Sequence, residues 1–360
     1  MKKVLVDLGE KSYNIYIEKD FKALEDLIEK SDKKALIITD TNVSPLYLRE
    51  VKEILEDKFS FVSTFEFEAG EKSKNIDILQ GMYRAAIKAG LDRKSCVVAL
   101  GGGVTGDMAG LLAATFMRGI GFIQIPTTLL SMVDSSVGGK VGIDFLGVKN
   151  IIGAFKQPDL VYVNTGALRT LPEREFKAGM GEVIKYAAIS DYSFLSFLTE
   201  NQKKITSLSY DELSSLIEIC LKIKADVVSK DEKENSYRMI LNFGHTIGHG
   251  IESAKNFSLL HGECVSLGMV CAFEIAHERG YVTEEYKKKF LSSLSSYGLL
   301  MSVSDIDANE VLAYVKNDKK KTGDFINFIL PTAEGEVRIL KDVTNEEMEN
   351  AINKIIGEQN

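Results

Sequence analysis

The chain has 360 residues, of which 45% are hydrophobic and 27% are charged, and its formal net charge at pH 7 is −8. This length is more than one hydrophobic core usually supports, so two domains are expected, and the composition excludes a largely disordered chain. The acidic balance argues against nucleic acid or an anionic membrane surface as a partner, because both need a basic protein surface.

The N-terminal half alternates apolar runs with amphipathic segments, which is typical of a doubly wound α/β domain. The apolar runs contain few polar residues, as expected for parallel strands that are buried on both faces. We expect strands at residues 33–40, 95–103, 120–126 and 159–164, and helices at residues 46–57 and 104–117.

A glycine-rich loop, GGGVTGD, lies at residues 101–107 between a predicted strand and a predicted helix. Its first, third and sixth residues are the glycines of the G-x-G-x-x-G pattern, in which bare backbone and a helix N-terminus bind the pyrophosphate of a dinucleotide. No acidic residue follows between residues 108 and 132 to bind the adenine ribose, but Asp40, at the end of an earlier strand, could do so. The alternative is a tight turn that only lets helix and strand pack closely; we favour a nucleotide.

From about Glu173 onward the pattern changes to long helical periods, with few strand runs before FINFILP at residues 325–331. Pro172 interrupts the chain just before this change. We therefore predict an α/β domain at residues 1–172 and a mainly α-helical domain at residues 173–360.

No membrane span and no signal segment are expected. The longest apolar stretch, residues 110–133, is interrupted by Arg118 and Pro126, and the start MKKVLVDLGE reaches Asp7 before an apolar run develops. The four cysteines show no paired spacing and are predicted to be buried free thiols. These features predict a cytoplasmic protein.

The histidines are concentrated in one part of the sequence. The chain has four of them, His245, His249, His261 and His277. His245 and His249 share one face if their segment is helical, because residues four apart are neighbours on a helix. A metalloprotease H-E-x-x-H motif is excluded, because Thr246 stands where the glutamate would be.

The histidines and one glutamate could bind a divalent metal. A catalytic metal usually takes three protein ligands and keeps one position open. His261 opens a second predicted helix, which a helical hairpin could bring to the first pair. The best carboxylate candidate is Glu182 in GMGEVIKY, with Lys185 one helical turn away. The alternative is that Glu182 and Lys185 form an exposed pair and that the histidines are ordinary core or surface residues.

Six segments together resemble the 3-dehydroquinate synthase family, in order and over nearly the whole chain. The resemblance implies a Rossmann-like NAD-binding domain followed by a helical domain that binds metal and substrate, usually as a cytoplasmic homodimer. The segments are ALGGGVTGDMAGLLAATFMRGI, IQIPTTLLSMVDSSVGGKVGID, KNIIGAFKQP, AGMGEVIKYAAI, RMILNFGHTIGHGIE and LLHGE.

The resemblance implies three sets of site residues. Zinc or cobalt is expected on Glu182, His245 and His261, which leaves His249 outside the metal shell. The NAD contacts are expected from Asp40, Asn42, Glu71, Lys72, Lys74, Gly103, Val104, Thr105, Gly106, Asp107, Thr127, Thr128, Lys140, Lys149 and Thr170. The substrate contacts are expected from Arg118, Asp134, Lys140, Asn150, Lys185, Lys224, Glu234, Arg238, Asn242, His249 and, from NDKKK, Lys320.

The resembled reaction converts 3-deoxy-arabino-heptulosonate 7-phosphate to 3-dehydroquinate and phosphate, with transient oxidation by NAD that is reversed within each turnover. This substrate carries a carboxylate and a phosphate, so fixed Lys and Arg donors would orient both ends. His249 and Glu234 are expected to move protons, whereas Lys140, Asn150 and Arg238 are expected to bind the phosphate end.

Three alternatives stay open at the level of sequence. Related sugar phosphate cyclases make inosose or valiolone rings with the same cofactors. Metal-dependent polyol dehydrogenases also place a GGG loop before a helical metal domain, but they would accumulate NADH. A nucleotide-binding regulator without chemistry is disfavoured by the complete set of metal and lysine residues.

Overall fold

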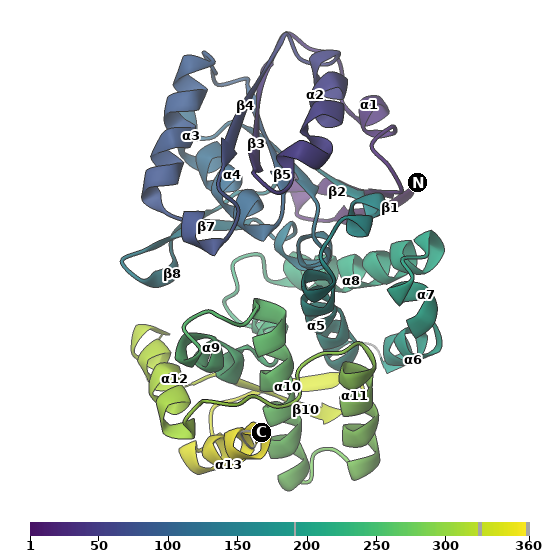
Figure 1. The fold of residues 1–360 in the computed structure, drawn as a ribbon, viewed down its shortest axis with the longest axis vertical. Helices are drawn as coiled ribbons and strands as arrows, with labels where there is room; N and C mark the ends of the chain where they lie inside the picture. The colour runs from purple at the N-terminus through teal and green to yellow at the C-terminus, as the bar shows by residue number, and fades with distance from the viewer. Residues whose placement is uncertain (191, 323–325, 358–360) are drawn as a thin grey trace. The chain divides into compact units, whose positions relative to one another are not determined.

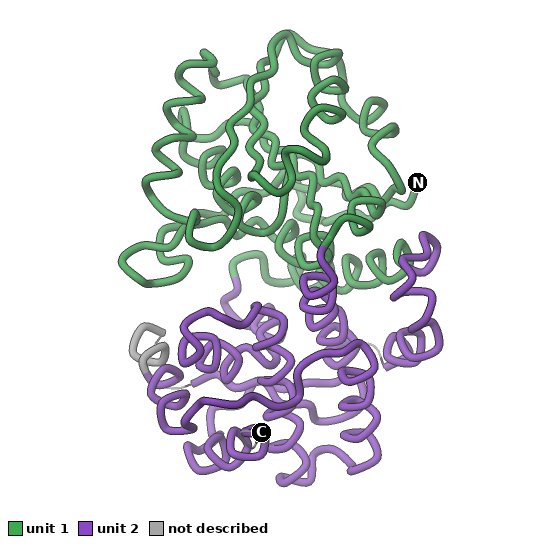
Figure 2. Tube along the Cα trace, viewed as in Figure 1, with its two compact units in different colours: residues 1–171, 213–233 green, residues 172–212, 234–360 purple. Residues whose placement is uncertain are grey.

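A computed structural model describes the backbone of residues 1–190, 192–322 and 326–357, and the side chains of those ranges apart from residues 317–322. The chain divides into two compact units (Figure 2). The first is Met1–Leu171 with Leu213–Lys233, and the second is Pro172–Glu212 with Glu234–Asn360. The division into domains at residue 172 stays a prediction.

The first unit contains, within the described residues, a seven-stranded sheet in the order β1-β2-β9-β6-β5-β3-β4 (Figure 1). Neighbouring strands are parallel except β1 and β2, which are antiparallel. The four predicted strands are confirmed as β3, β5, β6 and β9. The strands are β1 (Lys2–Val6), β2 (Tyr13–Glu18), β3 (Lys34–Asp40), β4 (Phe61–Phe67), β5 (Cys96–Gly101), β6 (Gly121–Pro126) and β9 (Leu160–Asn164).

Helices cover both faces of this sheet, so its central strands are mostly apolar on both faces. Leu36 of β3 and Val97 of β5 pack with α3 and α4, whereas Ile37 and Val98, their neighbours along the strands, pack on the opposite face with α1 and α2. All four side chains have no exposed area, and burying each contributes about 1.5–3 kcal/mol. The helices are α1 (Leu24–Leu27), α2 (Arg49–Glu56), α3 (Ile76–Lys88) and α4 (Gly103–Thr115).

Two further elements complete the first unit. An antiparallel hairpin consists of β7 (Lys140–Phe145) and β8 (Val148–Phe155). Helix α8 (Tyr210–Lys230) belongs to the unit from residue 213 onward, where Glu218 forms an ion pair of 3.0 Å with Lys2 of β1.

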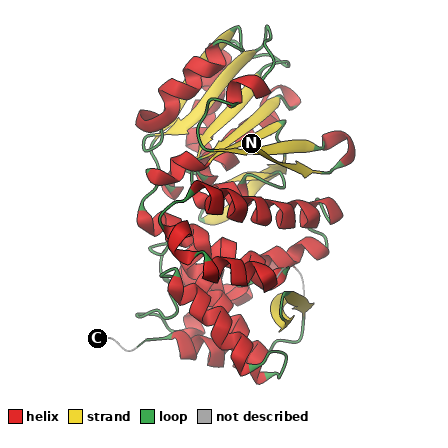
Figure 3. Cartoon of the chain, turned by 90° about the vertical axis from the view of Figure 1, so that its right-hand side faces the viewer, coloured by secondary structure: helices red, strands yellow, loops and turns green. Residues whose placement is uncertain are grey.

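The second unit is almost entirely helical, whereas the strands gather in the first (Figure 3). Helix α10 is largely buried, and a stacked pair of rings, Phe273 and Phe290, joins it to α11. The predicted strand near residues 325–331 is confirmed as β10, which pairs with β11. The elements are α5 (Glu173–Ile189), α6 (Tyr192–Glu200), α7 (Gln202–Thr206), α9 (His245–Ala254), α10 (His261–Glu278), α11 (Glu284–Ser296), α12 (Ala308–Thr322), β10 (Phe328–Ala333), β11 (Glu336–Leu340) and α13 (Asn345–Ile355).

Two expectations on apolar segments and thiols can be compared with the described chain. None of its helices combines the length and apolarity needed to cross a membrane. The four cysteines are buried and free of disulfides within the described residues, as predicted.

Candidate active site

Glycines let three helices of the second unit touch through their backbones. A Cβ atom on Gly262 of α10 would lie 1.8 Å from the carbonyl oxygen of Ala178 in α5, and one on Gly268 would lie 1.8 Å from that of Gly244, which precedes α9. Such distances admit glycine alone. The glycines stand beside the predicted metal donors, since Gly181 precedes Glu182, Gly244 precedes His245 and Gly262 follows His261.

The predicted metal donors lie together in the second unit. Oε1 of the buried Glu182 is 3.5 Å from Nε2 of His245 and 3.4 Å from Nε2 of His261. His249 belongs to the same group, because ring nitrogens of the three histidines all lie within 4.8 Å of one another. The carboxylate comes from α5, and the imidazoles come from α9 and α10.

This donor set fits a divalent metal by its chemistry. Nδ1 of His245 lies 3.1 Å from the carbonyl oxygen of Phe243, so an N–H there can donate and leave the Nε2 lone pair towards Glu182. Burial holds the pKa of His245 well below its ordinary value, which keeps the imidazole in the neutral form that metals bind. Lys185 donates a hydrogen bond to Oε2 of Glu182, which leaves Oε1 as the oxygen facing the imidazoles.

Other predicted substrate residues of the second unit precede α9. Glu234 has a left-handed backbone, with φ of 59°, and its Oε1 accepts a hydrogen bond of 2.9 Å from Nδ2 of Asn242. Arg238 is buried on the 3-10 helix Tyr237–Asn242. The side chain of Lys320 lies outside the described residues.

In the first unit, the glycine loop leads from β5 into the first turn of α4, as predicted. The first N–H groups of any helix lack an intrahelical acceptor and favour an anion. Thr105 in this turn donates a hydrogen bond of 3.0 Å to Oδ2 of Asp40, at the end of β3. Oδ1 of Asp40 accepts from the backbone N–H groups of Asn42 and Val43. The proposed ribose carboxylate is therefore fixed beside the proposed phosphate loop.

Lys74 joins two of the predicted sets in the first unit. Its buried Nζ donates to Oδ2 of Asp107 and to Oδ1 of Asn150, both at 2.6 Å. Burial alone would lower the pKa of Lys74, but the carboxylates of Asp107 and Glu71 outweigh it and raise the pKa above its ordinary value. The ammonium group therefore stays charged and ties the β7–β8 hairpin, which carries Asn150, to Asp107 near the start of α4.

Apart from Arg118, the remaining predicted residues of the first unit lie after strands β6 and β9, on the hairpin or on α8. Lys224 of α8 reaches Asp134, with Nζ 2.8 Å from Oδ1 and 2.7 Å from the backbone oxygen. Thr170 hydrogen-bonds with the hydroxyl of Tyr47. Thr127 and Thr128 directly follow β6, Lys140 begins β7, and Lys149 of β8 lies 3.7 Å from Glu71.

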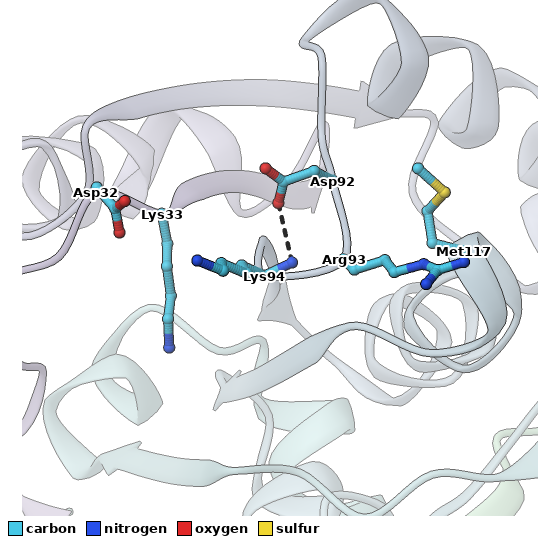
Figure 4. Close-up of a pocket in the computed structure, with 6 residues that line it drawn as sticks. All are labelled: Asp32, Lys33, Asp92, Arg93, Lys94 and Met117. Carbon is cyan, nitrogen blue, oxygen red and sulfur yellow. Dashed lines mark hydrogen bonds between the residues drawn. The ribbon is translucent and has the colours of Figure 1, made fainter.

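Arg118 lies at the amino ends of the strands, the opposite end of the sheet from the glycine loop. It precedes β6, whereas Thr127 follows this six-residue strand, and six residues of strand span about 20 Å. A surface hollow of about 420 Å³ lies at the same end of the sheet and is lined by Asp32, Lys33, Asp92, Arg93, Lys94 and Met117 (Figure 4). None of the predicted site residues, Arg118 included, is among the residues that line this hollow. Parallel sheets bind ligands beyond the carboxyl ends of their strands, so the hollow is not the candidate site.

Two partners in the site could not be found from residue types. The backbone oxygen of Phe243 orients His245, and Oδ1 of Asp144 accepts from the backbone N–H of Asn150 at 2.7 Å. A backbone carbonyl leaves no mark in a sequence. Asn150 has a left-handed φ of 52°, and its residue type is the signal that could have pointed to this conformation, because asparagine is enriched there among residues other than glycine.

Comparison with known families gives two matches along the chain. The family model of the 3-dehydroquinate synthase N-terminal region matches residues 64–178, and that of the 3-dehydroquinate synthase C-terminal region matches residues 179–321.

Comparison with curated proteins gives long matches to 3-dehydroquinate synthases. One from Acetivibrio thermocellus is 47% identical over 335 residues, which is 92% of this chain and 92% of the relative. One from a Thermoanaerobacter species is 43% identical over 341 residues, which is 94% of this chain and 96% of the relative.

Solved structures of similar fold include two sugar phosphate cyclases. A 2-deoxy-scyllo-inosose synthase, complexed with carbaglucose-6-phosphate, NAD⁺ and Co²⁺, is 26% identical with a TM-score of 0.91 and covers 99% of this chain and 100% of its own. A 2-epi-5-epi-valiolone synthase from Streptomyces hygroscopicus, with NAD⁺ and Zn²⁺ bound, is 25% identical with a TM-score of 0.89 and covers 97% and 98%. A probable glycerol dehydrogenase from Sinorhizobium meliloti, at 16% identity and a TM-score of 0.63, shares the fold alone.

Proposed function

The chain belongs to the 3-dehydroquinate synthase family, and on this premise we propose that it converts 3-deoxy-arabino-heptulosonate 7-phosphate to 3-dehydroquinate and phosphate with NAD and one divalent metal. The observation that supports this most is the position of one buried carboxylate oxygen, on Glu182, within 3.5 Å of Nε2 atoms on His245 and His261. Two imidazoles and one carboxylate leave a position open on a tetrahedral metal for substrate.

The second unit would hold the metal and move protons. Glu182, His245 and His261 would be the ligands, and a bound zinc or cobalt would supply a Lewis acid for the substrate hydroxyls. His249 lies beside the ligands, and histidine is the residue type most often used for proton transfer, so it would be the first proton-transfer group. Glu234, held by Asn242, would act as the second proton-transfer group.

The first unit would hold the dinucleotide, which supplies a reversible hydride acceptor when bound. The first turn of α4 would bind the pyrophosphate, and Asp40 would bind the adenine ribose. Glu71, Lys72, Lys74, Asp107, Thr127, Thr128, Lys140, Lys149 and Thr170 complete the proposed set.

Cationic side chains would orient the acidic substrate. Lys140, Asn150 and Arg238 would bind the phosphate end and stabilise the charge that develops as phosphate leaves. Lys185, Lys224, Asp134 and Asn242 complete the proposed set. The net charge of the protein does not oppose this, because fixed local donors decide the binding of a small anion.

We also propose a cytoplasmic homodimer. Arg118 supports the dimer, because it lies about 20 Å from the carboxyl edge of its own sheet and would have to contact substrate bound to a second protomer. The closed twofold pair is the commonest arrangement for soluble enzymes.

A phosphate-release assay with the heptulosonate phosphate, NAD and zinc tests the proposed reaction. We expect phosphate release without net growth of the nicotinamide absorbance, because the cofactor is regenerated. Accumulation of NADH with glycerol would instead identify a polyol dehydrogenase, and phosphate release from glucose 6-phosphate or sedoheptulose 7-phosphate would identify another sugar phosphate cyclase.

A substitution tests the metal centre within this proposal. His245→Ala should lose bound metal and turnover together, because one of three ligands is removed. His277→Ala is the matched control, since this histidine contacts Glu284 on the surface rather than Glu182. Full turnover of metal-free His245→Ala would contradict the proposed ligands.

A further inference from the structure

A forked ion pair joins the first turns of helices α5 and α10. Arg174 donates from Nε to Oε1 of Glu263 and from Nη2 to Oε2, both at 2.8 Å. Two parallel charge-assisted bonds fix the angle between the groups as well as their distance.

The same carboxylate caps the helix that begins with His261. Oε2 of Glu263 accepts a hydrogen bond of 2.8 Å from the backbone N–H of Leu260, the residue before α10. Nη2 of Arg174 also donates to the backbone oxygen of Ser258, at 3.2 Å. The turn between α9 and α10 is therefore tied at two points to the start of α5.

This turn has an unusual backbone that needs such ties. Asn256 and Phe257 both have left-handed conformations, with φ of 49° and 58°, which side chains other than glycine rarely adopt. Strained residues persist where the surrounding structure holds them. The turn directly precedes His261, so the position of the turn determines the position of the His261 backbone and of its imidazole.

The ion pair adds a second contact to the one that glycine provides. Helix α10 touches α5 through the backbone at Gly262, which meets both Ala178 and Gly181, and Arg174 lies one helical turn before Ala178. Backbone contact at a single residue of α10 fixes a distance and still permits rotation, whereas an additional contact one turn away along α5 fixes orientation. Glu182 lies eight residues beyond Arg174 on the same helix, about 12 Å along its axis.

We propose that Arg174 and Glu263 are positioning residues that set the metal affinity of the site by holding His261 towards Glu182. The proposal rests on the metal centre of the proposed function. Partners that orient metal ligands typically contribute 10–100-fold to metal affinity, so we expect each loss to weaken zinc binding roughly 10-fold.

Three substitutions separate this role from helix capping. Glu263→Gln retains an oxygen that can accept from the N–H of Leu260 but loses the charge that pairs with Arg174. Arg174→Gln removes the fork, and Arg174→Lys retains the charge with a single donor direction, so its affinity should be intermediate. The matched control is Glu173→Gln, which removes an exposed pair with Lys177 in the same turn of α5.

The measurement is zinc affinity by competition with a chromogenic chelator, with the visible spectrum of the cobalt form and the thermal midpoint of the metal-free protein as further readouts. We expect weaker zinc binding and an altered cobalt spectrum in Arg174→Gln and Glu263→Gln, parent behaviour in Glu173→Gln, and metal-free midpoints within a few degrees of the parent.

The outcomes distinguish this inference from the proposed function. If the parent binds no metal, or binds it equally well as His245→Ala, the proposed metal centre fails. If the parent binds metal through His245 while Arg174→Gln and Glu263→Gln keep parent affinity and spectrum, only the positioning role fails. Equal weakening in Glu173→Gln, or loss of helical signal in the metal-free variants, would also overturn it.

Discussion

Arg279 anchors the last helix of the chain by a forked contact. Its Nε and Nη2 atoms donate to the two carboxylate oxygens of Glu347, at 2.6 and 2.8 Å, and Glu347 also caps α13 at Thr344. Hydrogen bonds from Arg279 lower the pKa of Glu347 from 4.5 to about 2, against a smaller opposing effect of burial. The charged carboxylate therefore stabilises the folded state.

Glu347→Gln should lower the free energy of unfolding by about 1 kcal/mol at pH 7, after allowance for solvent screening of a partly exposed pair. Because the folded pKa is lowered, this stability is present above pH 4.5 and disappears as the pH falls through about 2. Urea unfolding of parent and variant at several pH values measures the difference.

Glu346→Gln is the control for that series, since this neighbour in the first turn of α13 is exposed. A gap between parent and Glu347→Gln that stays constant down to pH 2 would show that the carboxylate charge is not its source.

Single residues could be predicted where their chemistry is rare. Only four histidines occur in the chain, so their spacing, with Glu182 as a carboxylate candidate, pointed to a metal. The structure brings His245 and His261 beside that carboxylate and His249 beside the two imidazoles. Arg174 gave no such signal among 44 basic residues, because its partner Glu263 is 89 positions away. The contact between the backbone oxygen of Phe243 and the imidazole of His245 also depends on the folded backbone and has no signal in the sequence.

At the scale of elements, contact between helices depends on missing side chains. Helices usually pack 8–10 Å apart, with side chains between them. In the second unit, Gly262 and Gly268 remove those side chains at the crossings of α10 with α5 and with the turn before α9. The donors next to these crossings can then share one small volume.

Gly262→Ala should destabilise the protein by about 3 kcal/mol, because the added Cβ would lie 1.8 Å from a backbone oxygen that cannot move alone. It should also lose metal, since α10 must shift away from Glu182. Denaturant unfolding and bound zinc per chain measure both effects. Gly357→Ala, whose Cβ would meet its nearest atom at an ordinary 3.7 Å, should behave as the parent. Retention of stability and metal by Gly262→Ala would contradict backbone contact at this crossing.

Elements with both faces buried were predicted, and those at the edges of the sheet were not. The middle of β3 and most of β5 are continuous apolar runs, which are typical of parallel strands with both faces buried. Strand β4, FVSTFEF, alternates buried and exposed residues over only seven positions, and β1 is shorter still. Short alternating runs are ambiguous until a neighbouring strand pairs with them.

For the whole molecule, each compact unit is built from two separate segments of the chain, whereas the sequence pattern indicated one continuous segment for each. Residues 213–233 return to the first unit after the second has begun, and helix α8 continues through that point without a break. A helical period carries no sign of which core it packs on, so this return could not be predicted. The family resemblance supplied the two-part architecture that the periodicity alone only outlined.

Mixing two inactive variants tests the proposed homodimer. Arg118→Ala keeps its own site but supplies no arginine to a partner, whereas Lys140→Ala supplies the arginine and lacks a lysine at its own site. Unfolding and refolding the two together should restore roughly a quarter of parent activity, because half of random dimers then contain one complete site of two. Phosphate release before and after mixing measures this. Absence of recovery, in a mixture shown by size to be dimeric, would contradict the contribution of Arg118 to a partner's site.

The direct touching of main chains around Glu182, His245 and His261 affects how the centre responds to change elsewhere. Where side chains separate two packed helices, every gain or loss of a methyl group in those side chains changes the distance between the helices and between the ligands that they carry. Here the spacers are peptide units, whose dimensions are the same in every protein. Apart from positions that hold an end of a helix, as Arg174 does, the outer surfaces of these helices can therefore change in sequence while the ligand spacing stays as it is.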